Sequence, residues 1–212
     1  MPRNVTFILL PILIGIAAFL YWQHHQRIYQ DLGRLEVSQE GDAVILSWHT
    51  DIDVPMATRF REAFNEWGSK TGKFVIDLNS PGGALIEGNK VIEQINAMKP
   101  SHVIETHVGP NNVCLSMCVP IFLQGENRIA SGSSRWMFHE PTAYDYFSDE
   151  EVSAPKFERD YYNNRFFERY FTDSAMDPAW RENLRKEWVG KDVWRTGKQL
   201  VDERSNIIID LY

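Results

Sequence analysis

The sequence predicts an α/β domain that is built on a mostly parallel sheet and preceded by one transmembrane helix. From residue 43 onwards, short runs rich in β-branched residues alternate with longer segments whose apolar residues recur every three or four positions. Such alternation is typical of parallel strands joined by helical crossovers. Before the domain, residues 6–22 contain no charged side chain. The chain therefore divides into an anchor over 1–23, a stalk over 24–42 and the domain over 43–212.

The composition fits one globular domain with a small appendage. The chain has 212 residues, of which 43% are hydrophobic and 24% charged. The net charge of -7 argues against a nucleic-acid partner, because phosphate binding requires a basic surface. The surroundings of the two cysteines offer too few ligands for a zinc site, so we expect neither a metal nor a cofactor.

The uncharged run is close to the lower limit of roughly 17 residues for a helix that spans a bilayer. Tyr21 and Trp22 at its end suit the membrane interface. A cleaved signal peptide is the second interpretation, but the run is long for such a peptide and no small-residue cleavage site follows it. A buried soluble helix is the third. The very short flank before the run favours an orientation with the domain outside the cytoplasm.

The strands and helices of the domain are predicted from their apolar patterns. The expected strands are Ala43–Trp48, Lys73–Leu78, Val103–Val108, Arg128–Ala130, Arg135–Phe138 and Asn206–Asp210. The expected helices are Pro55–Trp67, Ala84–Met98, Ser116–Leu123, Phe157–Phe171 and Pro178–Trp188. The second helix should have its apolar side at Ile86, Val91, Ile92, Ile95 and Met98. Residues 144–152 are expected to form a mobile loop.

Both cysteines of the chain, Cys114 and Cys118, flank Ser116 at a turn from strand to helix. Four residues apart around a helix start, their Cα atoms should be roughly 6 Å apart, which is within the range for a disulfide. Plain core packing is the alternative. Ser116 is either a helix cap or a nucleophile, and a nucleophilic serine requires a base.

Two further motifs suit the second role of Ser116. The segment N-S-P-G-G, residues 79–83, ends a strand just before a helix, and its N–H groups could stabilise an oxyanion. The alternative is an ordinary turn. His139, in W-M-F-H-E-P, lies at the end of a short strand before a proline, a context that the other five histidines lack. It is a candidate base or, alternatively, an edge-strand residue.

These motifs, in this order, resemble those of the Clp protease proteolytic subunit and its relatives in the Clp/crotonase superfamily. The separation of histidine and serine, 139 − 116 = 23 residues, is close to that family's. The resemblance extends from Val44 to about Thr142 and again over Lys191–Ile209. It implies a fold of repeated ββα units. The C-x-S-x-C version is similar to membrane-anchored or secreted bacterial members.

The resemblance also implies roles for individual residues. Ser116 would be the nucleophile and His139 the general base. The N–H groups of Gly83 and Met117 would form the oxyanion hole, with Gly82 in the same loop. The third triad member would be Asp192, in K-D-V-W-R-T-G, at 192 − 139 = 53 residues from the histidine. Its rivals are Glu140, Asp145 and Asp149.

Two residues depart from the family pattern. Leu115 stands where the family has alanine or glycine before the serine, and Pro120 falls in the first turns of the following helix. Both would narrow the cleft. The long helices that assemble the family's rings are not recognisable, so a homo-oligomer is compatible with the sequence but a barrel is not implied.

The resemblance thus implies a membrane-anchored serine hydrolase, most simply a peptidase acting on peptides or proteins. Its expected location is the bacterial inner membrane, with the domain in the periplasm. The first alternative is a catalytically inactive module that binds peptides or partner proteins. The others are acyl-CoA chemistry, which the Ser-His pair disfavours, and a serine-lysine dyad, although Lys73, Lys90 and Lys99 show no placement that marks any of them as the base.

Overall fold

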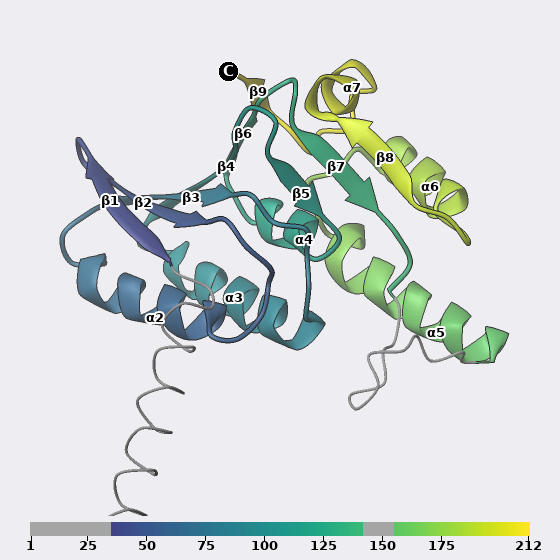
Figure 1. Cartoon of the computed structure of the whole chain (residues 1–212), viewed down its shortest axis with the longest axis horizontal. Coiled ribbons are helices and arrows are strands. Elements are labelled where there is room, and N and C mark those ends of the chain that lie inside the picture. The colour runs from purple at the N-terminus through teal and green to yellow at the C-terminus, as the bar shows by residue number, and fades with distance from the viewer. Residues whose placement is uncertain (1–34, 142–154) are drawn as a thin grey trace, which may run out of the picture. The chain divides into compact units, whose positions relative to one another are not determined.

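The computed structural model describes residues 35–141 and 155–212 of the chain (Figure 1). The expected anchor over 1–23 and the loop over 144–152 lie outside these residues. Among the described helices, none combines the length and the apolar character that crossing a membrane requires. The domain begins at Leu35 rather than at residue 43, because the end of the expected stalk pairs with the first predicted strand as an antiparallel hairpin.

The larger sheet has six strands in the order β1-β2-β3-β4-β6-β9. Their bounds are Glu36–Glu40 (β1), Ala43–Trp48 (β2), Lys73–Leu78 (β3), Val103–Val108 (β4), Asn127–Ala130 (β6) and Asp210–Leu211 (β9). Every pairing except that of β1 with β2 is parallel, as the alternation of strands and helices predicts. The core side of the central strands is fully buried, at Leu46, Ile76 and Ile104 for example.

Helices α2 (Met56–Trp67) and α3 (Leu85–Met98) lie on the same side of this sheet (Figure 1). The α2 helix inserts Phe60 and Phe64 between Trp48 and Phe74 in edge-to-face contacts, and each such buried ring contributes about 2 kcal/mol or more. The predicted apolar side of α3 is wrong at one end. Ile86 is 73% exposed, and the buried face consists of Glu87, Gly88, Val91 and Ile95.

A second sheet of three strands crosses the end of the first and was not predicted as a unit. It contains β5 (Val113–Leu115), β7 (Arg135–Phe138) and β8 (Val193–Thr196), which lie side by side in Figure 1. Strand β5 is parallel to β7, and β8 is antiparallel to it. Of its three strands, only β7 is predicted from the sequence, with the same bounds; β5 and β8 are not. This small sheet carries the serine, the histidine and the aspartate.

The C-terminal part packs against this small sheet. Helix α5 (Lys156–Phe167) continues into a π-helical turn over Glu168–Thr172, followed by α6 (Pro178–Glu187) and α7 (Gly197–Asp202). The last strand is shorter than predicted, for a physical reason. The buried guanidinium of Arg128 donates to the carbonyls of Asn206 and Ile207, so only Asp210–Leu211 remain to pair with β6.

Candidate active site

Ser116 occupies a tight corner between β5 and helix α4 (Cys118–Phe122). Its φ angle of 52° is in the left-handed region, where a non-glycine residue costs roughly 1 kcal/mol or more. The predicted helix therefore begins after the serine and not at it. The corner is held by two hydrogen bonds, because the Ser116 N–H donates to the Met137 carbonyl and the Ser116 carbonyl accepts from Val119.

A disulfide between Cys114 and Cys118 closes the corner on its core side. The two Cα atoms are 5.1 Å apart, and both side chains are fully buried. Of the two interpretations left open by the sequence, the structure therefore contains the bridge. The bridge links the last strand residues before the serine directly to the first turn of α4, so it limits how far the corner can open.

His139 reaches Ser116 from the neighbouring strand. The parallel pairing of β5 with β7 sets Leu115 opposite Met137, so the serine and the histidine both lie just beyond that pair. The distance from His139 Nε2 to Ser116 Oγ is 2.7 Å. Burial lowers the pKa of His139 below its ordinary value of 6.5, and the charge of Asp192 opposes this shift only in part. The imidazole is therefore neutral, as a base must be, at pH 7.

Asp192 lies on the far side of the imidazole but is not hydrogen-bonded to it. Its Oδ1 is 4.0 Å from His139 Nδ1, and its side chain is 53% exposed. Among its rivals, Glu140 accepts a hydrogen bond from the Gly190 N–H, and Asp145 and Asp149 lie outside the described residues. Asp192 is the only one of these carboxylates within 4 Å of His139 in the part of the chain that is described.

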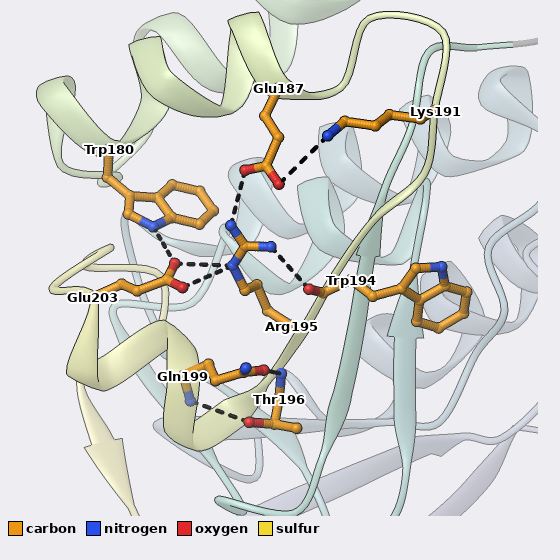
Figure 2. Close-up of polar contacts among 8 residues, drawn as sticks. All are labelled: Trp180, Glu187, Lys191, Trp194, Arg195, Thr196, Gln199 and Glu203. Carbon is orange, nitrogen blue, oxygen red and sulfur yellow. Dashed lines mark hydrogen bonds and ion pairs between the residues drawn. The ribbon is translucent and has the colours of Figure 1, made fainter.

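Arg195, three residues after Asp192, lies at the centre of a group of polar contacts (Figure 2). The Arg195 Nε donates to both oxygens of Glu203, the residue just after α7, and Nη2 donates to Glu187 in α6 over 2.8 Å. A further bond from Nη1 reaches the Trp194 carbonyl. One guanidinium thus ties α6, β8 and α7 together, which holds the strand next to Asp192 while the carboxylate itself is solvent-exposed.

The loop Asn79–Gly83 is clamped on both sides. On one side, the Ser80 N–H donates to the Val113 carbonyl and the Leu115 N–H to the Ser80 carbonyl. On the other, the Ile52 N–H donates to the Gly82 carbonyl over 2.8 Å and the Ala84 N–H to the Ile52 carbonyl over 2.7 Å. The loop is therefore hydrogen-bonded both to Ile52, in the segment between β2 and α2, and to β5, which leads to the serine corner.

Glycine is required at both ends of this contact. Gly82 has a φ of 97°, and a Cβ there would be 2.7 Å from the Ser116 Cβ. Gly83 has a φ of 146°, and its Cβ would be 2.4 Å from the Ile52 carbonyl oxygen. A side chain at either position would push the loop away from the serine.

Two backbone donors beside Ser116 have no acceptor among the described residues. They are the N–H groups of Gly83 and Met117. A Cβ on Gly82 would be 3.2 Å from the Met117 nitrogen, which places the loop directly against this donor. Buried N–H groups are nearly always paired, and Met117 is fully buried. The Met117 N–H therefore requires an acceptor, whereas Gly83 is exposed and its N–H is accessible to solvent or to a ligand.

A cleft of about 1200 Å³ runs beside the histidine and the aspartate. Leu85 and Asn89 of α3 form one wall, and Phe166 and Tyr170 form another. The three lysines considered as alternative bases are paired elsewhere: Lys73 with Glu105, Lys90 with Glu87 and Lys99 with Gln124.

The disulfide predicts a thiol titration result. Oxidised, folded protein should show no free thiol, and reduction should lower the free energy of unfolding by about 2 kcal/mol or less, because so short a loop removes little chain entropy. Oxidised and reduced samples of the same chain form the matched pair, and urea unfolding measures the difference. Two thiols that titrate in the folded, oxidised protein would contradict the bridge.

Comparison with known proteins gives the same fold. The model of the family described as Clp protease matches residues 45–175. No curated protein matches the chain. Among solved structures, a ClpP1 mutant from Listeria monocytogenes is 17% identical with a TM-score of 0.62, over 79% of this chain and 90% of that one. A mutant of the 1510-N membrane-bound stomatin-specific protease is 12% identical with a TM-score of 0.64, over 82% and 81%. Because the family model covers more than half of its residues, the chain belongs to the Clp protease family.

Proposed function

We propose that this chain is a serine peptidase with Ser116 as nucleophile, His139 as general base and Asp192 as the third triad member. The observation that carries the proposal is the 2.7 Å contact between His139 Nε2 and Ser116 Oγ, beside the Gly83 and Met117 N–H groups, which have no acceptor within residues 35–141 and 155–212. A helix cap would need neither the histidine nor the free donors. The substrate is a peptide or a segment of a protein.

The mechanism assigns each group one task. Ser116 Oγ attacks the carbonyl carbon of the scissile bond while its proton passes to His139 Nε2. The oxyanion that forms is held by the Gly83 and Met117 N–H groups. His139 then gives its proton to the leaving amine, and afterwards activates the water that hydrolyses the acyl-enzyme. Asp192 stabilises the imidazolium at 4.0 Å and acts more strongly if it closes to hydrogen-bonding distance.

The proposal includes an anchor at the bacterial inner membrane, with the domain on the periplasmic side. It is supported by the uncharged run of residues 6–22, which lies outside the described residues. The disulfide gives independent support, because such bridges persist in oxidising compartments.

Substitutions at the triad test the mechanism. Ser116→Ala, His139→Ala and the double variant should lose activity on a peptide ester about equally, by several powers of ten, because members of such a unit are not additive. Asp192→Asn should lose less, since the Asp192 carboxylate is not bonded to the imidazole. Labelling by a fluorophosphonate probe measures the nucleophile directly.

The matched control is His49→Ala, which removes a histidine that is paired with an aspartate, Asp77, away from the candidate site. It should retain full activity. A wild-type chain that the probe labels no better than Ser116→Ala would end the peptidase proposal. If that chain still binds peptides, the inactive binding module takes its place.

The lowered pKa of His139 predicts the pH profile. The base form is required, so the acid limb of kcat/KM should have its midpoint below pH 6.5. Asp192 raises the pKa of His139, so Asp192→Asn should move the limb to still lower pH. A midpoint above 6.5, or an upward shift in the variant, would contradict the arrangement of charges described above.

Fractionation and protease protection test the anchor. The full chain should sediment with membranes, and a chain beginning at Gln30 should be soluble. Protease added to spheroplasts should digest the domain. Digestion only after lysis would place the domain in the cytoplasm and reject this part of the proposal.

A further inference from the structure

One buried carboxylate has no role in the mechanism above. Glu87 is only 4% exposed and lies in the first turn of α3. We infer that Glu87 is a positioning residue that, with Gly88, fixes the spacing of the two oxyanion donors, Gly83 and Met117. The inference rests on the proposed function, because it concerns the same oxyanion hole.

The Glu87 carboxylate caps a helix other than its own. In helix α2, the residue at the N-cap position is Pro55, whose side chain cannot accept a hydrogen bond from the first turn. Glu87 Oε1 instead accepts from the Ala57 N–H of α2 over 2.9 Å, and Oε2 lies 3.3 Å from Lys90 Nζ. The positive ends of two helices and one lysine thus stabilise the buried charge.

This contact closes a ring that contains the first donor. Ile52 is bonded to Gly82 and Ala84 at one end of the crossover, and Ala57 is bonded to Glu87 at the other. The segments 52–57 and 82–87 are therefore joined at both ends. The Gly83 N–H lies inside this closed ring, so the ring determines where that N–H points.

The second donor rests on the next residue of α3. A Cβ on Gly88 would be 2.5 Å from both Cγ and Cε of Met117. The Met117 side chain therefore lies directly on the α3 backbone one residue after Glu87. The first turn of α3 touches both halves of the oxyanion hole, and its position sets the distance between them.

Loss of the Glu87 contact should act on the transition state. Without an acceptor, the buried Ala57 N–H is unpaired and the start of α2 loosens from α3. Misplacing one oxyanion donor costs up to about 100-fold in rate. Because these donors act mainly on the oxyanion of the transition state, kcat should fall while KM changes little.

The sharpest test compares Glu87→Met with Glu87→Gln in the full chain. The two side chains have similar length and volume, but only glutamine retains an oxygen for the Ala57 N–H. On a peptide ester, Glu87→Met should lower kcat by about 10- to 100-fold with KM within twofold, and Glu87→Gln should restore most of it. Amide exchange at Ile52 and Ala84 should accelerate in the Met variant alone.

Two further variants separate positioning from general stability. Asp177→Ala removes the cap of α6, where the Asp177 side chain accepts from the Trp180 N–H over 2.8 Å. It should lower stability without lowering kcat. Gly88→Ala displaces Met117 without removing the Glu87 carboxylate, and should also lower kcat. It replaces Glu87→Met as the test if that variant does not fold.

Equal kcat in Glu87→Met and wild type, or an equal loss in Asp177→Ala, would overturn the inference. A wild-type chain no more active than Ser116→Ala would reject the proposed function instead. In that case kcat cannot be compared, and amide exchange is the remaining test of the inference. Unchanged exchange at Ile52 and Ala84 in Glu87→Met would overturn it.

Discussion

No side chain fits between Gly82 and Ser116, and the candidate site follows from that contact. The loop of residues 79–83 approaches the serine corner until a single Cβ would collide. Its carbonyl and amide groups form hydrogen bonds with β5 on one side and with Ile52 on the other. The larger sheet and the smaller sheet are therefore coupled through this glycine-containing loop, which carries the Gly83 N–H and lies against the Met117 N–H.

Burial has a larger effect on the protonation of His139 than its pairing with Asp192 does. The imidazole is largely covered, which favours its neutral form, whereas the aspartate beside it faces solvent. An aspartate at 4.0 Å and half exposed stabilises an imidazolium less than a buried, bonded one does. The strand that follows Asp192 is held to its neighbours by Arg195 (Figure 2), whereas the Asp192 carboxylate is 4.0 Å from the imidazole.

The large sheet and its two covering helices follow from apolar periodicity, because α2 and α3 repeat buried residues over three turns or more. The order of the motifs in the sequence is enough to predict Ser116 and His139 as candidate nucleophile and base, but only the structure gives the distance between them. Strands β5 and β8 were not predicted, because each has a single buried residue and so lacks the apolar run that marks the other strands.

Glu87 did leave a signal in the sequence, since it falls on the same helical stripe as Val91 and Ile95, but a charge on such a stripe is easily assigned to the surface. The distance of 4.0 Å between Asp192 Oδ1 and His139 Nδ1 depends on how the two side chains are placed, and the spacing of residues in the sequence does not predict this.

The tail of the chain illustrates how a peripheral segment becomes part of the interior. Arg128 is 5% exposed and directs its donors to the carbonyls of Gly125, Asn206 and Ile207. Ile207 is itself fully buried. Proteolytic trimming from the C-terminus would therefore be tolerated only as far as the short last strand. Removal of Asn206 and Ile207 as well would leave the buried guanidinium of Arg128 without two of its acceptors, which would destabilise the core.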